Sequence, residues 1–191
     1  MSPLDPYAVA EVLGRALEAL GVPYYLGGSL ASSLPGEPRS TNDVDMVVEL
    51  SLGLAERLAA NLGEDFEVDV EDLKAAVRLR RSTQLYFLQS FTKVDLYICG
   101  ESDLDRDSMR RRRRFTLLSG ATLWISSPED TIVRKLYWYR LGQEVSDRQW
   151  RDVLGMLRVG RGDLDRTYLV RAAELAGIAD LLAEAERDVG P

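Results

Sequence analysis

Two aspartates of this sequence are placed where they could hold a metal ion together. Asp43 and Asp45 flank Val44 at the start of an apolar run, and the two-residue period of a strand puts both carboxylates on one face. Neighbouring carboxylates repel each other, and a hard divalent ion with oxygen ligands is their natural partner. The alternative is that one acid caps a turn while the other is solvated at the strand edge.

A third acid, Asp95, lies inside another apolar run between Lys93 and Tyr97. A carboxylate within such a strand needs a partner, because burying an unpaired charge is costly. The partner is either the same metal ion or a nearby lysine or arginine in a salt bridge.

Glycines precede the acid pair at the point where a short apolar strand gives way to a helical turn. Gly27 and Gly28 leave the backbone open to a close approach by phosphate, and the Ser29 hydroxyl adds a donor. The alternative is a tight turn that needs glycine only for its geometry. Arg39 and the two hydroxyl residues that follow it are placed either to steer phosphate or to cap the loop.

The composition excludes several classes of enzyme. The 191 residues include no histidine, which rules out a Ser-His-Asp triad, an HExxH zinc helix and an imidazole base. Cys99 is the only cysteine, so we expect a small buried side chain and no disulfide or CxxC pair. The net charge of -7 argues against a protein that coats nucleic acid through general electrostatics.

The length fits one domain with a single core, or one domain with a small appendage. No apolar run approaches the roughly 18 residues that a membrane helix requires, and the N-terminal residues lack the basic and apolar regions of a signal peptide. We therefore expect a cytoplasmic protein with no membrane partner.

Strands and helices alternate through the first two thirds of the chain. We expect a helix over 5–20, a strand over 23–26, a helical turn over 29–34, a strand over 44–50, a helix over 52–62, an edge strand over 66–68, a helix over 71–79, hairpin strands over 84–89 and 93–98, a helix over 103–114 and a strand over 121–125. The hairpin makes the sheet mixed.

Helices alone are expected in the last third. Ser127 provides a hydroxyl cap, Pro128 suits the first turn, and two acids follow near the positive end of a helix that runs to about Leu141. Further helices are predicted over 147–157, 163–176 and 178–187. The predicted fold class is α/β (α+β), with a mixed-sheet core over 1–126 and a helical region over 127–191 packed on it.

Five consecutive arginines, Arg110 to Arg114, close the helix predicted over 103–114. Such a run either grips an acidic partner or forms a solvated face that is salt-bridged by the aspartates upstream. A solvated, salt-bridged face is the interpretation we favour. Trp138 and Tyr139 are expected in the core rather than on a base-stacking surface.

These motifs, taken in order, resemble the minimal nucleotidyltransferases of the polymerase-β-like superfamily. Within that superfamily the sequence is similar to the AbiEii-type toxin and to related bacterial proteins. The resemblance covers roughly residues 22–155 and lies in the glycine turn at 27–29, in the segment 39–45, in 93–95, and in 127–131 with Lys135, Arg148 and Asp152 beyond.

The resemblance implies a role for each matching residue. Asp43, Asp45 and Asp95 would be the catalytic carboxylates and the ligands of Mg²⁺ or Mn²⁺, with Asp95 also helping to activate the acceptor hydroxyl. The nucleotide phosphates would be held by the residues of the glycine turn and by two basic side chains: Gly27, Gly28, Ser29, Arg39 and Lys135. For Lys135 the alternative is a solvated helix position.

The implied activity is metal-dependent transfer of a nucleoside monophosphate from ATP or another nucleoside triphosphate to a hydroxyl on RNA (tRNA included), protein or a small molecule. A toxin-type enzyme would also have an antitoxin as its partner. Two alternatives remain open: an enzyme that modifies a small compound, as the aminoglycoside-modifying members do, and a non-catalytic nucleotide-binding or regulatory domain of the same fold.

Overall fold

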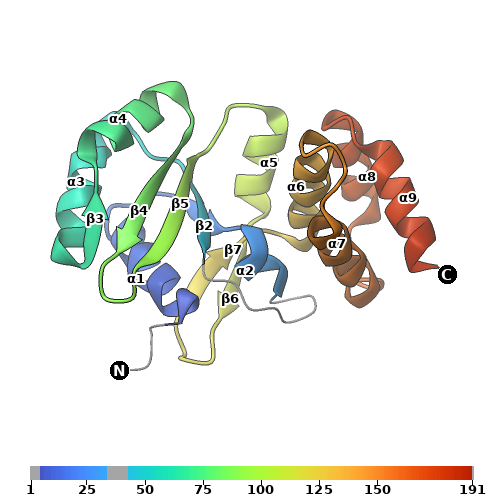
Figure 1. Cartoon of the computed structure of the whole chain (residues 1–191), viewed down its shortest axis with the longest axis horizontal. Helices are drawn as coiled ribbons and strands as arrows, with labels where there is room; N and C mark the ends of the chain where they lie inside the picture. Colours follow the sequence, from blue (N-terminus) through green and yellow to red (C-terminus); the bar gives the residue numbers. More distant parts are fainter. Residues whose placement is uncertain (1–4, 34–42, 191) are drawn as a thin grey trace. The chain divides into compact units, whose positions relative to one another are not determined.

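The computed structural model describes residues 5–33 and 43–190 (Figure 1). The described chain divides into two compact units: residues 5–30 and 43–125 form the N-terminal unit, and residues 31–33 and 126–190 form the C-terminal unit. Within these ranges, no helix combines the length and apolarity needed to cross a membrane. Division into domains over 1–126 and 127–191 stays a prediction.

The N-terminal unit is built on one mixed sheet, in the order β3-β4-β5-β2-β1-β7-β6. Its strands are β1 (Tyr24–Leu26), β2 (Val44–Val48), β3 (Phe66–Val68), β4 (Ser82–Phe87), β5 (Thr92–Ile98), β6 (Arg113–Thr116) and β7 (Thr122–Ile125). The pairs β2–β5 and β1–β7 are parallel, whereas the other neighbours are antiparallel. The predicted mixed sheet is therefore confirmed, with the β4–β5 hairpin as expected.

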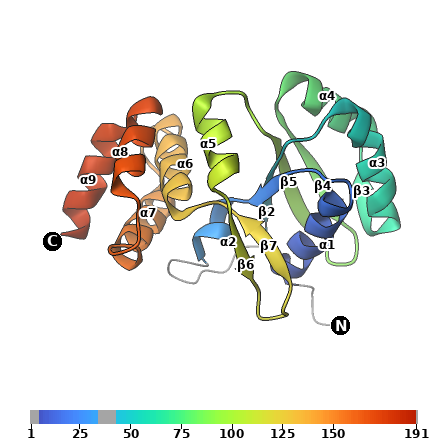
Figure 2. The ribbon, with the colours of Figure 1, turned by 180° about the vertical axis from the view of Figure 1, so that it is seen from behind.

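The described helices of this unit are α1 (Pro6–Ala19), α3 (Leu52–Leu62), the short 3-10 helix Gly63–Asp65, α4 (Val70–Leu79) and α5 (Asp103–Arg111). The helix α2 (Gly28–Ser33) begins in this unit and ends in residues assigned to the other. The strand period divides the sheet into two faces, since Val44, Met46 and Val48 of β2 are buried while the residues between them are only half-buried. The helix α1 contacts β1, β2 and β7 with its apolar face (Figure 2). The second face carries the polar residues described below.

The helix predicted over 103–114 is wrong at its C-terminal end. It begins with a capping box formed by Ser102 and Asp105 but ends at Arg111, and Arg113–Thr116 form the edge strand β6. Arg114 pairs with Trp124 of β7, and its guanidinium lies 5.5 Å from the centre of the indole ring. Strand pairing and this cation–π contact override the helical propensity of arginine.

The C-terminal unit contains the helices α6 (Pro128–Leu141), α7 (Asp147–Val159), α8 (Arg166–Leu175) and α9 (Ala179–Val189). All four predicted helices are confirmed, with ends shifted by up to three residues. Within this unit, α6 packs against α7 and α8, and α9 packs against the same two helices.

Buried polar contacts tie the start of α6 to α8. Ser127 accepts a hydrogen bond from the Asp130 backbone N–H at 3.1 Å, as a helix cap should. The Tyr168 hydroxyl donates to Asp130 Oδ1 at 2.6 Å, and the Asp165 backbone N–H donates to Glu129 Oε1 at 2.8 Å. The two acids that favour the helix terminus therefore also fix the position of a second helix.

The core prediction for Trp138 is wrong, because this side chain lies on the surface of α6 and is 52% exposed. Tyr139 is half-buried and packs against Trp150 of α7, with ring centres 5.2 Å apart. Two adjacent residues of a helix point about 100° apart, so both aromatic rings could not face the same neighbour.

Candidate active site

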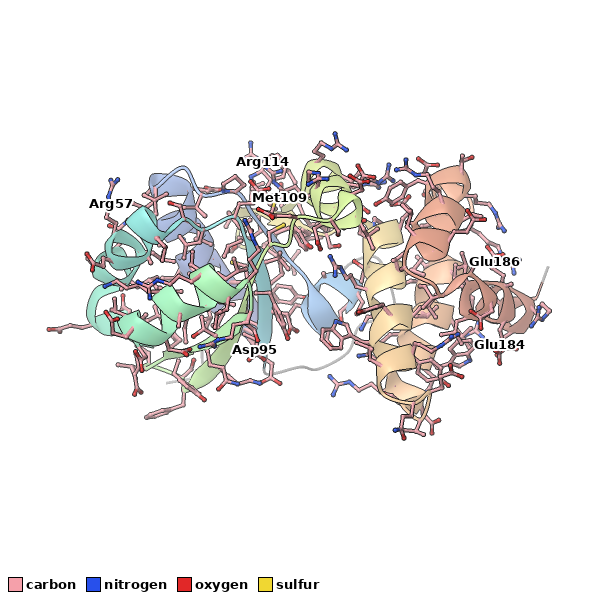
Figure 3. The ribbon with its side chains drawn as sticks, turned by 90° about the horizontal axis from the view of Figure 1, so that it is seen from above. Arg57, Asp95, Met109, Arg114, Glu184 and Glu186 are labelled. Atoms are coloured by element: carbon pink, nitrogen blue, oxygen red, sulfur yellow. The ribbon has the colours of Figure 1, made fainter. Side chains whose placement is uncertain are left out.

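The predicted carboxylates Asp45 and Asp95 lie side by side in the sheet. Strands β2 and β5 are parallel and in register, so Asp45 is directly opposite Asp95. Both side chains are on the half-buried face, whereas the apolar residues on either side of each acid are buried in the core. Asp43 immediately precedes β2 and is exposed. Figure 3 labels Asp95 on β5.

Asp95 also has the salt bridge that the sequence offered as an alternative to a metal. The Lys93 ammonium lies 2.8 Å from Asp95 Oδ2, and the two side chains are 32% and 16% exposed. Hydrogen bonding to Asp95 raises the pKa of Lys93, and the negative charges of Asp43 and Asp45 act in the same direction. Lys93 therefore belongs to the site, although the sequence analysis did not assign it there.

Tyr97 is a further site residue that the sequence analysis missed. It follows Asp95 by one strand period and lies opposite Val47, the residue two positions after Asp45. Burial, then the charge of Asp45, then that of Asp95 raise the pKa of the Tyr97 hydroxyl to about 12. The same two-residue spacing that linked Asp43 to Asp45 could have identified both Lys93 and Tyr97.

The glycine turn lies against Asp45. The Gly27 N–H donates to the Asp45 carbonyl oxygen at 2.8 Å. Gly28 has a φ of +59°, and a Cβ atom at this position would lie 1.9 Å from Asp45 Oδ2. Both the left-handed backbone and the approach of the carboxylate therefore require glycine here. The structure brings Gly27 and Gly28 to the acid pair.

Two other predicted phosphate contacts stay predictions. Ser29 follows Gly28 in the first turn of α2 and is half-buried. Arg39, together with Ser40 and Thr41, lies outside the described residues. The phosphate roles of Ser29 and Arg39 therefore rest on the sequence.

The oxygen-only donor set suits Mg²⁺ or Mn²⁺, which prefer carboxylates and water. In the ranges 5–33 and 43–190, however, no three acidic, cysteine or histidine side chains converge closely enough to hold a metal ion as they stand. Asp95 is turned toward Lys93 instead. Asp45 and Asp95 fit such an ion in donor type and in strand register, while Asp95 is paired with Lys93.

Lys135, in the C-terminal unit, is almost fully buried. Its ammonium lies 2.7 Å from Asp152 Oδ2 and 3.4 Å from Gln149 Oε1, both on α7. The alternative of a solvated lysine is therefore wrong, and Lys135 and Asp152, both matched by the resemblance, are in direct contact. Arg148 is exposed on α7.

The arginines of the run at 110–114 differ in their surroundings. Asp107 pairs with Arg110, and Asp103 pairs with Arg106 at 2.7 Å, so α5 carries the salt-bridged face that we favoured. Arg112 instead lies over the Trp124 ring, 4.6 Å from its centre. The run is thus divided between a helix end, an aromatic contact and an edge strand.

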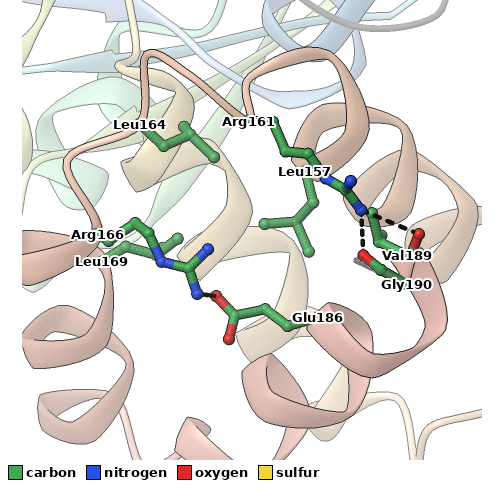
Figure 4. Close-up of a pocket in the computed structure, with 8 residues that line it drawn as sticks. All are labelled: Leu157, Arg161, Leu164, Arg166, Leu169, Glu186, Val189 and Gly190. Atoms are coloured by element: carbon green, nitrogen blue, oxygen red, sulfur yellow. Dashed lines mark hydrogen bonds and ion pairs between the residues drawn. The ribbon is translucent and has the colours of Figure 1, made fainter.

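A small pocket among α7, α8 and α9 does not involve the predicted site residues (Figure 4). Arg166 pairs with Glu186 across it at 2.7 Å, and Arg161 donates to the Val189 carbonyl at 3.2 Å. Both guanidinium groups are therefore used to join helices of the C-terminal unit.

Comparisons with known proteins identify the fold. No protein-family model and no curated protein sequence matches this chain. Among solved structures, an antigenic nucleotidyltransferase-like protein from Paracoccidioides brasiliensis is similar, with a TM-score of 0.57, 20% identity, and coverage of 94% of this chain and 91% of that one.

Two further structures match at similar length. The antibiotic-resistance factor ANT(2'')-Ia has a TM-score of 0.57 at 16% identity and covers 94% of this chain and 95% of its own. The lincosamide antibiotic adenylyltransferase LnuA, bound to lincomycin, has a TM-score of 0.53 at 11% identity, covering 83% and 99%. The chain therefore has the fold of the polymerase-β-like nucleotidyltransferases, with a mixed-sheet core followed by helices.

Replacing Gly28 with alanine tests whether Asp45 is held by this turn. The new Cβ must displace the Asp45 carboxylate and adopt an unfavourable positive φ, so we expect the free energy of unfolding to fall by about 2–4 kcal/mol. Urea denaturation measures it. Gly53→Ala is the matched control, because a Cβ there meets nothing within 4 Å and should stabilise α3 slightly. Equal effects of both substitutions would contradict the close approach.

Asp152→Asn tests the buried ion pair of the C-terminal unit. The substitution leaves the Lys135 ammonium buried beside a neutral amide, and we expect a loss of about 2–4 kcal/mol in the free energy of unfolding. Glu186→Gln removes the more exposed pair with Arg166 in the same unit and should cost about 0–1 kcal/mol. Chemical denaturation compares the two, and similar losses would show that the burial of Lys135 is unimportant.

Proposed function

We propose that this chain is a metal-dependent nucleotidyltransferase that transfers a nucleoside monophosphate from a nucleoside triphosphate to a hydroxyl group. The observation that carries the proposal is the parallel register of β2 and β5, which sets Asp45 beside Asp95, together with the Gly27–Gly28 turn against Asp45. Paired carboxylates next to an open backbone turn suit a metal-bound triphosphate.

The comparisons support the reaction class through the fold. One match is named as an adenylyltransferase and another as nucleotidyltransferase-like, and both cover more than four fifths of this chain. Because one fold can host several chemistries, the argument for activity rests on the carboxylates themselves.

We assign Asp43, Asp45 and Asp95 as the metal ligands. When bound, Mg²⁺ or Mn²⁺ would neutralise charge on the attacking and leaving oxygens of an in-line displacement. The Gly27–Gly28 turn and Ser29 would orient the triphosphate. Asp95 would accept the proton of the acceptor hydroxyl as its oxygen bonds to the α-phosphorus and pyrophosphate leaves with the electrons of the broken bond.

Two basic residues complete the proposed phosphate contacts. Arg39 precedes Asp43 in the chain, and the family resemblance assigns Lys135 to the same role. The ammonium of Lys135 is already paired with Asp152 within the C-terminal unit. Nucleotide phosphates would therefore have to compete with Asp152 for this lysine.

A small hydroxyl compound is the acceptor we consider first. The matches to ANT(2'')-Ia and LnuA cover 95% and 99% of those chains, whose names refer to antibiotic resistance and to lincosamide adenylylation. A net charge of -7 also favours a cationic acceptor over nucleic acid. An RNA- or protein-modifying toxin with its antitoxin, and a domain that binds nucleotide without turnover, are the alternatives.

Transfer of label from α-labelled nucleoside triphosphates tests the activity. The acceptors are bulk tRNA, protein, and a panel of aminoglycosides, lincosamides and other hydroxyl compounds, each with Mg²⁺ or Mn²⁺. We expect labelled small-molecule product, and Asp45→Asn should lower its rate at least about a hundredfold because an amide cannot replace a carboxylate as a metal ligand.

Asp103→Asn is the control for this loss. It makes the same chemical change and the same change in net charge on an exposed side chain of α5, so the rate should stay near that of the wild type. Label on tRNA or protein would favour the toxin alternative. Metal-dependent nucleotide binding without any transfer would support the binding-domain alternative, and neither transfer nor binding would contradict the proposal.

A further inference from the structure

Lys93 pairs with one carboxylate of the proposed metal site and lies on the same half-buried face as that carboxylate. It lies one strand period before Asp95 on the same face of β5. The parallel register pairs Val44 with Val94 and Asp45 with Asp95, and Asp43 directly precedes this paired segment. Lys93 thus pairs with one proposed metal ligand, Asp95, which lies directly opposite a second, Asp45.

This lysine is the only basic residue on the three strands that form the centre of the site. The described strands β2, β4 and β5 read VDMVV, STQLYF and TKVDLYI. On the face of the acids, β4 contributes Gln84 opposite Asp95 and Tyr86 opposite Lys93, and neither carries a charge. Within these strands, neutralisation of the carboxylates depends on Lys93.

The ion pair between Lys93 and Asp95 is partly buried, but its lysine keeps access to water. The ammonium is 2.8 Å from Asp95 Oδ2, and Lys93 keeps about a third of its side chain exposed. A lysine ammonium is positive at neutral pH, and the ion pair with Asp95 favours this charged form. A flexible side chain with access to water can leave the carboxylate without a large rearrangement.

We propose that Lys93 is a built-in counter-ion of the catalytic carboxylates, which a divalent metal ion must displace, and that Lys93 thereby sets the metal affinity of the site. This inference rests on the metal site of the proposed function. Without metal, the lysine offsets the repulsion among the acids. With metal, the same carboxylate oxygens are needed as ligands, so the lost ion pair weakens binding.

Mn²⁺ binding, measured by electron paramagnetic resonance of the free ion in the absence of nucleotide, tests the proposal. Lys93→Met should bind Mn²⁺ about tenfold more tightly than the wild type, because a cation that competes with Mn²⁺ is removed. Its melting temperature without metal should fall, and the increase on adding Mn²⁺ should exceed that of the wild type.

Two variants serve as controls. Lys74→Met makes the same change on α4, where Lys74 pairs with Glu71 at 2.9 Å and with Glu56, and it should leave Mn²⁺ affinity within about twofold. Lys93→Arg keeps the charge and offers a forked donor that grips carboxylate more firmly, so it should bind Mn²⁺ no more tightly than the wild type. This variant also keeps the test decisive if Lys93→Met fails to fold, since Mn²⁺ binding by Lys93→Arg that is tighter than wild type would overturn the proposal.

The outcomes separate this inference from the proposed function. Unchanged or weaker Mn²⁺ binding by a folded Lys93→Met, or equal tightening by Lys74→Met, overturns the counter-ion role. If Asp45→Asn does not weaken Mn²⁺ binding, the metal site itself is misassigned. Tighter binding by Lys93→Met without nucleotidyl transfer by the wild type leaves the counter-ion in place and contradicts only the activity.

Discussion

The parallel, in-register pairing of β2 with β5 is the constraint on which the rest of the site depends. It fixes which residues face the core and which face outward, because a strand turns successive side chains to opposite sides. A slip of one residue would bury Asp45 and expose its neighbours Val44 and Met46. The free-energy cost of burying that charge disfavours the slipped register. The observed register keeps Asp45 beside Asp95.

Several local features follow from the same pairing. The carboxylate of Asp45 occupies the space where any side chain at position 28 would lie, which explains the glycine and its left-handed backbone. Lys93 lies on the polar face because it is one strand period from Asp95. The positions of the acids, the glycine turn and the lysine thus all follow from the pairing of β2 with β5.

The sequence predicted what depends on local spacing. The apolar run after Asp43 marked β2, and the cap at Ser127 with Pro128 marked the start of α6. The shared face of Asp43 and Asp45 stays a prediction. Which strand adjoins which depends on distant pairing, so the position of Asp45 opposite Asp95 and the edge strand β6 could not be identified in the same way. The roles of Ser29 and Arg39 as phosphate contacts remain predictions from the sequence.

The C-terminal unit shows how polar contacts can specify a helical arrangement. Hydrophobic burial alone tolerates several packings of amphipathic helices, whereas the hydrogen bonds of Glu129 and Asp130 to α8 are satisfied in only one. The pair of Lys135 with Asp152 adds the same kind of selection between α6 and α7. Breaking any of these contacts would leave a buried polar group without its partner, which lowers the stability of the unit.

The two edge strands of the sheet, β3 and β6, affect how readily molecules associate at high concentration. β3 has only three residues, with Glu67 exposed at its centre, and β6 presents exposed arginines at positions 113 and 114. A strand from a second molecule could extend the sheet only by bringing its backbone alongside these charges. Short, charged borders offer a poor template for that growth, so they favour dispersed molecules over stacked or fibrous assemblies.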